Sequence, residues 1–312
     1  MSRTSDGPPP DASAIVTPAL PVDLALTFGQ IAPIGRDPGL RREATTTWWR
    51  ATRTPEGPAT VRYSGGGYAV AVRAWGPGAE WAVEFAPEAI GATDSLQGFE
   101  PGRGLVGELH RRFPGLRIPR TRAVFEALVP SVLAQKVTGA EAGAARRRLM
   151  RAWGEPAPAA PGAPSLRVLP EPDAIARRPY HEFHPLGIER RRAKVLSFAA
   201  ARAPRLEETV EMTAPDAQRR LMAFPGIGPW TAAEVAGVAL GDADAVSVGD
   251  FHIPNTVAWA LRGEPRGDDA AMLEALQPYA GHRGRVIRLI EAAGIRAPRF
   301  GPRSPVRSMR SI

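Results

Sequence analysis

Residues 221–250 read LMAFPGIGPWTAAEVAGVALGDADAVSVGD, and this stretch decides the fold. A helical pattern runs to Phe224, and Pro225, Gly226 and Gly228 then predict a tight turn, because glycine alone tolerates positive φ at little cost. A second helix with an apolar face follows directly. The stretch therefore predicts a helical hairpin, and the unpaired amides at the start of its second helix suit a phosphate group.

A single carboxylate follows this hairpin. The second helix begins at about Trp230, Pro229 fits its first turn, and an apolar connector then leads to Asp250. The hairpin 224–228, FPGIG, and an acid at this distance resemble the helix-hairpin-helix DNA glycosylases, which remove damaged bases. A plain helical hairpin with a surface aspartate is the alternative interpretation.

The composition limits the class of protein. The chain has 312 residues, 44% of them apolar, which suffices for two or three domains. No apolar run is long enough to predict a membrane span, and the N-terminus lacks the pattern of a signal peptide. Because the chain contains no cysteine, disulfides, thiolate zinc sites and a cysteine-held iron–sulfur cluster are excluded. We expect a cytoplasmic, nucleoid-associated monomer that makes no contact with membranes.

The net charge of +8 favours a nucleic-acid partner, but only weakly. Four arginines, and no acid, lie in the last residues of the chain, at Arg299, Arg303, Arg307 and Arg310. Without them the net charge is 8 − 4 = +4, which is modest. Charge alone therefore leaves DNA binding undecided.

The first third of the chain predicts an antiparallel sheet domain over residues 23–104, after a disordered segment 1–22. Alternating patterns predict strands at 48–53, 61–63, 68–75 and 81–85. Four tryptophans belong to these strands, and core filling is favoured for them over stacking with nucleobases. They are Trp48, Trp49, Trp75 and Trp81.

The remainder predicts an all-helical domain over residues 105–298, so the fold class is α+β. A long helix is expected over 124–150, kinked or restarted at Pro130. Two helical subdomains are expected within it, and residues 155–172 are expected to form a proline-rich connection, an insertion or loop. Thr213 is expected to cap the first hairpin helix. The basic tail 299–312 is expected to be disordered.

The same order of domains resembles one branch of the family, the 3-methyladenine DNA glycosylase II branch. The similarity covers roughly residues 22–298. It is carried by FEALV at 125–129, LAQKVT at 133–138 and LGI at 186–188. The resemblance implies base excision repair: a monofunctional enzyme rotates an alkylated purine out of double-stranded DNA and hydrolyses its N-glycosidic bond.

The resemblance also assigns residues. Asp250 is the implied catalytic carboxylate, which stabilises positive charge on the sugar as the base leaves. The base pocket is expected to contain Trp230, Glu234, His252, His282 and Phe125. Trp230 occupies the position of the lysine nucleophile of backbone-cutting members, so no lyase activity is expected. Glu234 and His282 replace residues that are aromatic in the resembled branch, which leaves the substrate range open.

A second set of residues is implied to contact DNA: Gly226, Ile227, Gly228, Thr231, Gln135 and Lys136. In the resembled branch an apolar residue follows the glutamine and enters the minor groove, whereas this chain has Lys136 there. No metal site made of side chains and no cofactor are expected. Backbone carbonyls of the hairpin, at Phe224 and Gly226, are implied to hold a monovalent Na⁺ or K⁺ ion.

Two other functions stay open at this point. Helix-hairpin-helix units also occur in DNA-binding modules without catalysis. A glycosylase for oxidised or mismatched bases is the other alternative, although Trp230 and the absence of cluster cysteines disfavour it.

Overall fold

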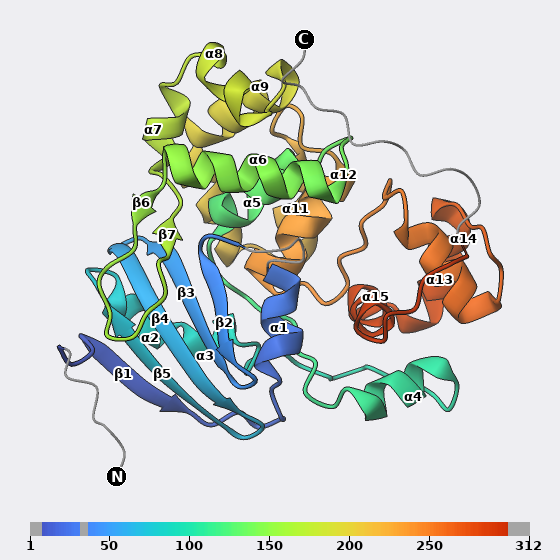
Figure 1. Cartoon of the computed structure of the whole chain (residues 1–312). Coiled ribbons are helices and arrows are strands. Elements are labelled where there is room, and N and C mark those ends of the chain that lie inside the picture. Colours follow the sequence, from blue (N-terminus) through green and yellow to red (C-terminus); the bar gives the residue numbers. More distant parts are fainter. Residues whose placement is uncertain (1–7, 32–36, 299–312) are drawn as a thin grey trace.

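The computed structural model describes residues 8–31 and 37–298, and it places one antiparallel sheet beside a larger group of helices (Figure 1). The sheet has five strands in the order β1-β5-β4-β3-β2, and all neighbouring pairs are antiparallel. The α+β fold class is confirmed. The strands are β1 (Ala12–Val16), β2 (Leu40–Ala44), β3 (Thr47–Thr54), β4 (Gly57–Gly66) and β5 (Ala69–Trp75).

The first strand corrects one prediction. Residues 12–16 were expected to be disordered, yet β1 pairs with β5 from Ala12 opposite Ala74 to Val16 opposite Val70. Val16 and Val70 are buried, so this segment is ordered because a tertiary partner pairs with its backbone. The predicted disorder of residues 1–7 and of the tail 299–312 lies outside the described residues.

The predicted strand 81–85 is also wrong. Residues Ala79–Glu84 form the helix α2, followed at once by α3 (Ala86–Ala89). Ala79, Ala82 and Ala86 are buried against the sheet at helical spacing. The alternation of WAVEF resembles a strand, but the small residues every third or fourth position form the helix face that packs.

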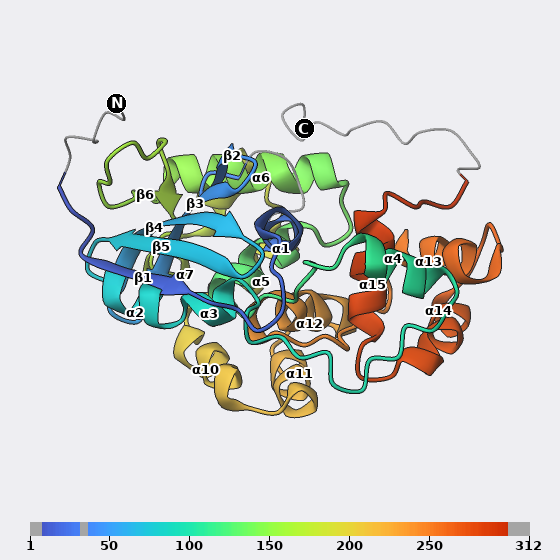
Figure 2. The ribbon, with the colours of Figure 1, turned by 90° about the horizontal axis from the view of Figure 1, so that it is seen from below.

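The other face of the sheet is covered by the proline-rich connection. This connection forms a two-stranded hairpin, β6 (Glu155–Pro156) and β7 (Arg167–Val168). Trp49 and Trp75 are buried between the sheet and this hairpin, with ring centroids 5.8 Å apart. Figure 2 shows the hairpin on one side of the sheet and α2 and α3 on the other. Core filling is therefore confirmed for these two tryptophans.

The helices form two cores. One contains side chains from α5 (Val124–Leu133) to α12 (Pro229–Val235). The other contains side chains from α4 (Leu105–Arg112), α13 (Ile253–Arg262), α14 (Asp269–Leu276) and α15 (Arg283–Ala292). Helix α4 precedes α5 in the chain but packs against α15 (Figures 1 and 2). Two connecting segments, 113–123 and 241–252, therefore link the cores. The first is tied to the continuation of α12 (Ala236–Leu240), because the amides of Thr121 and Arg122 donate to the carbonyls of Val238 and Ala239.

The helices outside the sheet layer are α1 (Leu24–Ile31), α4 (Leu105–Arg112), α5 (Val124–Leu133), α6 (Gly139–Ala152), α7 (Pro172–Ala176), α8 (Tyr180–Phe183), α9 (Arg190–Ala200), α10 (Ala203–Glu207), α11 (Ala214–Met222), α12 (Pro229–Val235), α13 (Ile253–Arg262), α14 (Asp269–Leu276) and α15 (Arg283–Ala292). Within the described ranges, none of these helices is long and apolar enough to cross a bilayer.

The single helix expected over 124–150 is in fact two helices. The break does not occur at Pro130, which stays inside α5, but at residues 134–138. Lys136 has φ +56°, and Thr138 begins α6 with a capping box in which Glu141 bonds back to it. The sequence signal for this break is the spacing Thr138-x-x-Glu141, which our sequence analysis missed.

Candidate functional site

The hairpin between α11 and α12 has the expected geometry. Thr213 caps α11, and its hydroxyl accepts a hydrogen bond from the amide of Asp216. Gly226 has φ +87°, and a Cβ there would lie 2.3 Å from Cγ2 of Val195, so only glycine fits. Gly228 does not need the positive φ that the sequence pattern predicted for it. Its φ is −97°, and a Cβ there would meet no other atom. Both glycines are exposed at the tip of the turn.

The side chain of Gln135 fastens the break between α5 and α6 to this hairpin. Its Nε2 donates to the carbonyl oxygen of Gly226 at 3.0 Å and to the hydroxyl of Thr231 at 2.9 Å. Lys136, the next residue, is exposed in a left-handed backbone conformation. The hairpin tip and Lys136 are therefore held beside each other on one exposed surface.

Asp250 lies at the start of α13, and its two carboxylate oxygens have different partners. Oδ1 accepts hydrogen bonds from the backbone amides of His252 and Ile253, at 2.7 and 2.8 Å. Oδ2 accepts one from the indole Nε1 of Trp230, at 2.9 Å. The structure thus joins the predicted catalytic acid to α12, and the carboxylate is half-buried.

A cleft lies beside Trp230, between the sheet part and the helical part. Two helices that pack against each other line it with side chains spaced four residues apart, and residues with small side chains on α5 and α6 leave the space open. The facing residues are Glu126, Pro130 and Ala134 on α5, and Trp230, Glu234 and Val238 on α12 and its continuation. Two predicted pocket residues, Trp230 and Glu234, are therefore brought together.

Glu234 has both a neutral and a charged neighbour. It accepts a hydrogen bond from the hydroxyl of Ser247. Arg288 forms an ion pair with Glu291 at 2.9 Å. Burial lowers the pKa of Arg288, but the carboxylates of Glu291, Glu234 and Asp250 outweigh this effect and raise its pKa above the usual value. The charge of Glu234 is therefore opposed by one guanidinium that also pairs with Glu291.

The far end of the cleft holds an ion pair that sequence analysis did not find. Arg50 of β3 is 4% exposed and donates to Glu126 at 2.9 Å, and Thr52 donates to the same carboxylate at 2.8 Å. Burial lowers the pKa of Arg50, but the opposite effect of Glu126 and Tyr63 is larger, so the pKa lies above its usual value. The available signal was Glu126 itself, a lone acid in the otherwise apolar helix 124–133.

Two residues predicted for the pocket lie elsewhere. Phe125 is 3% exposed and packs in the core formed by α5 to α12. His282 is 7% exposed, and its Nε2 lies 2.9 Å from the carbonyl oxygen of Gln97 while its Nδ1 accepts from Nε of Arg285 at 3.2 Å. Neither lines the cleft, so both predictions are wrong on position.

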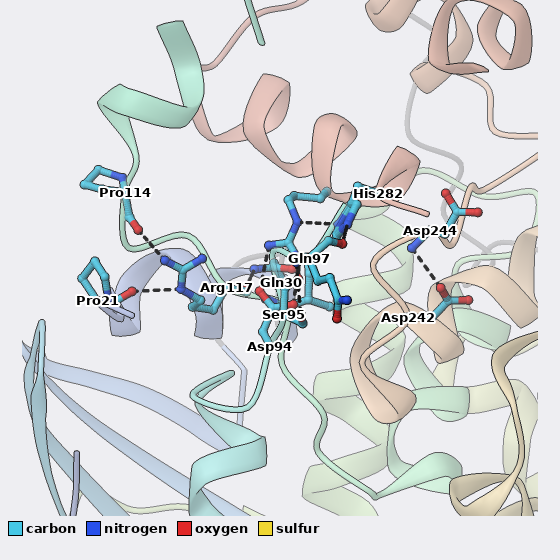
Figure 3. A network of polar contacts seen from close by, with 12 residues as sticks. Pro21, Gln30, Asp94, Ser95, Gln97, Pro114, Arg117, Asp242, Asp244 and His282 are labelled. Atoms are coloured by element: carbon cyan, nitrogen blue, oxygen red, sulfur yellow. Dashed lines mark hydrogen bonds and ion pairs between the residues drawn. The ribbon is translucent and has the colours of Figure 1, made fainter. Parts of the chain in front are cut away.

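Figure 3 shows what surrounds His282 instead. Arg285 forms two hydrogen bonds with Asp94, at 2.6 and 2.7 Å, and both side chains are almost fully buried. Arg117 donates to the carbonyl oxygens of Pro21 and Pro114, at 3.0 and 2.8 Å (Figure 3). This network fastens the sheet part to the core around α15, and it is structural.

The remaining predicted residues divide by exposure. His252 is exposed next to Asp250. Ile227 and Thr231 are 4% and 2% exposed, so their side chains are core residues and leave only backbone groups for DNA. The carbonyl oxygens of Phe224 and Gly226 already accept one hydrogen bond each, from the amide of Ile227 and from Gln135.

The chain is similar in sequence to known proteins over part of its length. No family model matches the chain. The chain is 34% identical over 171 residues, 53% of its length, to a Mycobacterium tuberculosis protein described as probable bifunctional transcriptional activator/DNA repair enzyme AlkA, of which the match covers 31%. It is 35% identical over 133 residues, 41% of its length, to DNA-3-methyladenine glycosylase 2 of Escherichia coli, of which the match covers 45%. The matches thus span less than half the length of these relatives.

Solved structures share the fold over most of the chain. The 3-methyladenine DNA-glycosylase from Archaeoglobus fulgidus superposes with a TM-score of 0.75 at 18% identity, covering 89% of this chain and 97% of that one. An 8-oxoguanine glycosylase/lyase from Clostridium acetobutylicum, in complex with double-stranded DNA, has a TM-score of 0.64 at 14% identity, covering 92% and 99%. At these identities the likeness concerns the fold.

Proposed function

Because its sequence matches and its fold bear out the resemblance to the helix-hairpin-helix DNA glycosylases and their 3-methyladenine branch, we propose that this chain is a base-excision-repair DNA glycosylase for alkylated purines. One observation carries the proposal: the Asp250 carboxylate is hydrogen-bonded to Trp230, which lines the cleft. An acid is thereby held beside a pocket that admits an extruded base.

The proposed reaction uses the geometry of the site. The target nucleotide rotates out of the duplex, and its base enters the cleft between α5 and α12. The bond between base and sugar breaks as positive charge builds on the sugar ring, and the fixed carboxylate of Asp250 stabilises that charge. Water then adds to the anomeric carbon, and an abasic site remains.

DNA is proposed to bind along the exposed surface that joins the hairpin tip to Lys136. Gly226 and Gly228 allow a phosphate to approach the backbone closely, and Lys136 adds a positive charge. We also propose a Na⁺ or K⁺ ion at the remaining lone pairs of the Phe224 and Gly226 carbonyls. Exchanging potassium for tetramethylammonium at constant ionic strength is then expected to weaken binding of a duplex, measured by fluorescence anisotropy.

The direct test is a base-release assay with enzyme in excess. The substrates are duplexes that contain 3-methyladenine, 7-methylguanine, hypoxanthine or 8-oxoguanine. We expect release of the alkylated purines, and we expect Asp250→Asn to lower that release at least about 100-fold, as the loss of one preorganised catalytic group does. Asparagine keeps the shape and can still accept from the amides of His252 and Ile253.

The same variant separates the proposal from its first alternative. A DNA-binding module without catalysis predicts no release by the wild type, and equal binding by the wild type and Asp250→Asn. Release by Asp250→Asn within about tenfold of wild type would move the chemistry away from Asp250.

We further propose that the enzyme is monofunctional and acts as a monomer. Trp230 offers no amine, so the DNA strand is expected to stay intact and borohydride is expected to trap no covalent protein–DNA adduct. An adduct through Lys136 or Lys194 would instead favour the glycosylase/lyase alternative. Light scattering of the protein with and without duplex tests the monomer.

A further inference from the structure

We infer that Phe251 is a DNA-stacking residue: its ring enters the duplex beside the extruded nucleotide and takes the place of the base that has left the stack. This inference rests on the proposed function, because it requires a nucleotide bound at Asp250. It assigns a positioning role to a residue that sequence analysis did not single out.

The first observation is the exposure of Phe251, 83% of its side chain. Ile15 and Tyr68 have comparable exposure, at 74% and 60%, but they belong to the sheet part. Phe251 differs from them in its position, because it directly follows Asp250, whose carboxylate is proposed to act on the sugar. An aromatic ring left in water at that position is suited to a ligand that supplies a flat apolar surface.

The second observation is that the backbone around Phe251 is fixed. The amide of Gly249 donates to both carboxylate oxygens of Asp269, at 3.0 and 3.1 Å, and the amide of Asp250 donates to the carbonyl of Ser247 at 3.2 Å. The carboxylate of Asp250 accepts hydrogen bonds from the backbone amides of His252 and Ile253. The chain on either side of the ring is therefore tied down, and the exposure of Phe251 does not come from a loose loop.

A neighbouring ring also orients the side chain. The rings of Phe251 and His252 meet edge to face, with centroids 4.9 Å apart and an interplanar angle of 86°. Such a contact restricts the rotamers of an exposed phenylalanine and lowers the entropy that it loses on binding. The ring is presented in a nearly fixed direction from the start of α13.

The third observation concerns the turn between α5 and α6. Its exposed tip residue is Lys136, whose charged end is poorly suited to the interior of a base stack. Contacts run without interruption from this turn to Phe251: Gln135 holds the hairpin, Trp230 begins the second helix of the hairpin, and Trp230 holds Asp250. The lysine and the phenylalanine are thus each adjacent in the chain to a residue of this series, Lys136 to Gln135 and Phe251 to Asp250. We assign the phosphate contact to Lys136 and the stacking contact to Phe251.

The physical reason is the vacancy that extrusion creates. Rotating a nucleotide out breaks two stacking contacts, and apolar side chains such as phenylalanine recover part of this loss when they insert between base steps. One base–aromatic stack contributes about 1–3 kcal/mol. The stacked ring therefore favours the extruded state of the DNA, and its effect is largest where the base must be pulled out of a paired duplex.

The experiment compares binding of two duplexes of the same sequence, one intact and one with a stable abasic analogue at its centre. We expect Phe251→Ala to weaken binding of the abasic duplex by roughly fivefold or more, since the loss of one stacking contact costs at least about 1 kcal/mol. Binding of the intact duplex is expected to change little. Phe251→Trp is expected to keep the preference. Tyr68→Ala, an exposed aromatic on the sheet part, is the matched control and is expected to behave as wild type.

Two results would overturn the inference: equal binding of the abasic duplex by Phe251→Ala and wild type, or a loss that is the same for both duplexes. If Lys136→Ala loses the preference and Phe251→Ala keeps it, Lys136 is the stacking residue. Because the binding assay contains no base to release, it reports on Phe251 separately from the activity. A wild type that releases none of the tested bases contradicts the proposed function, whereas a wild type without preference for the abasic duplex contradicts this inference.

A second readout distinguishes stacking from a general effect on the site. Single-turnover release by Phe251→Ala is expected to fall several-fold for a lesion in a paired duplex and to stay near wild type for the same lesion in a single strand. An equal fall on both substrates would place Phe251 in the support of Asp250 instead.

Discussion

The indole nitrogen of Trp230 lies 2.9 Å from Oδ2 of Asp250 and donates a hydrogen bond to it. Sequence analysis had assigned these residues separate tasks, an aromatic face for the base and a charge for the sugar. Under the proposed function Trp230 therefore has both tasks, because it lines the cleft and donates a hydrogen bond to the acid. It also explains how a carboxylate that does not itself line the cleft is held beside it.

Trp230→Phe separates these two functions, because phenylalanine keeps an aromatic face but donates no hydrogen bond. We expect single-turnover base release to fall by about tenfold, which corresponds to the loss of about 1.5 kcal/mol from a hydrogen bond to a charged group. Trp259→Phe, on the partly exposed surface of α13, is the control. A rate within twofold of wild type would show that the hydrogen bond does not position Asp250.

Glu234→Gln tests whether the negative charge of Glu234 selects the substrate. Release of a cationic base such as 7-methylguanine is expected to fall more than release of neutral hypoxanthine, by at least about fivefold, since one ion pair contributes about 1 kcal/mol even at high dielectric. Glu291→Gln is the matched control, because Glu291 forms the ion pair with Arg288 but does not line the cleft. An equal fall for both bases would mean that Glu234 acts through shape.

Asp94→Asn is expected to destabilise the protein. The variant leaves Arg285, which is 1% exposed, without its ionic partner, and breaking a buried pair in this way costs about 3–5 kcal/mol. Urea unfolding gives the change in the free energy of unfolding. Asp173→Asn is the comparison, because the pair of Asp173 with Arg177 is exposed and its loss is expected to have little effect.

Glu207 predicts a pH dependence of stability. Its carboxylate is largely buried and accepts from the amides of Val124 and Phe125, at 2.9 Å each, at the start of α5. Burial raises its pKa above the ordinary value of 4.5, and the two amides reduce this shift only in part. The folded protein therefore binds this proton more tightly than the unfolded chain.

The sign of the effect follows from linkage. The contribution of Glu207 to stability is complete below pH 4.5, the ordinary pKa of a glutamate in the unfolded chain. It is lost as the pH rises through the raised pKa of Glu207 in the folded protein. Relative to Glu207→Gln, which does not titrate, the wild type is expected to lose stability as the pH rises from about 4.5 towards neutrality. Urea unfolding of both proteins at several pH values measures the difference, and a constant difference would contradict the raised pKa.

Local patterns predicted much of this protein from the sequence. The turn of the hairpin, the cap at Thr213 and the strands β3, β4 and β5 were found because each depends on neighbours a few residues away. The family resemblance then ordered the domains and identified Asp250. One error on local structure occurred where two patterns fit the same residues: WAVEF alternates like a strand, yet Ala79, Ala82 and Ala86 form a helix face.

The tertiary structure alone decided which side chains meet at the candidate site. Arg50 and Glu126 are 76 positions apart in the chain, and Trp230 and Asp250 are 20 apart, so no local period brings them together. Phe125 and His282 showed the opposite case, because the family resemblance made them pocket candidates and packing buried them elsewhere. Spacing within one helix determines a face, whereas burial of that face depends on the elements that pack against it.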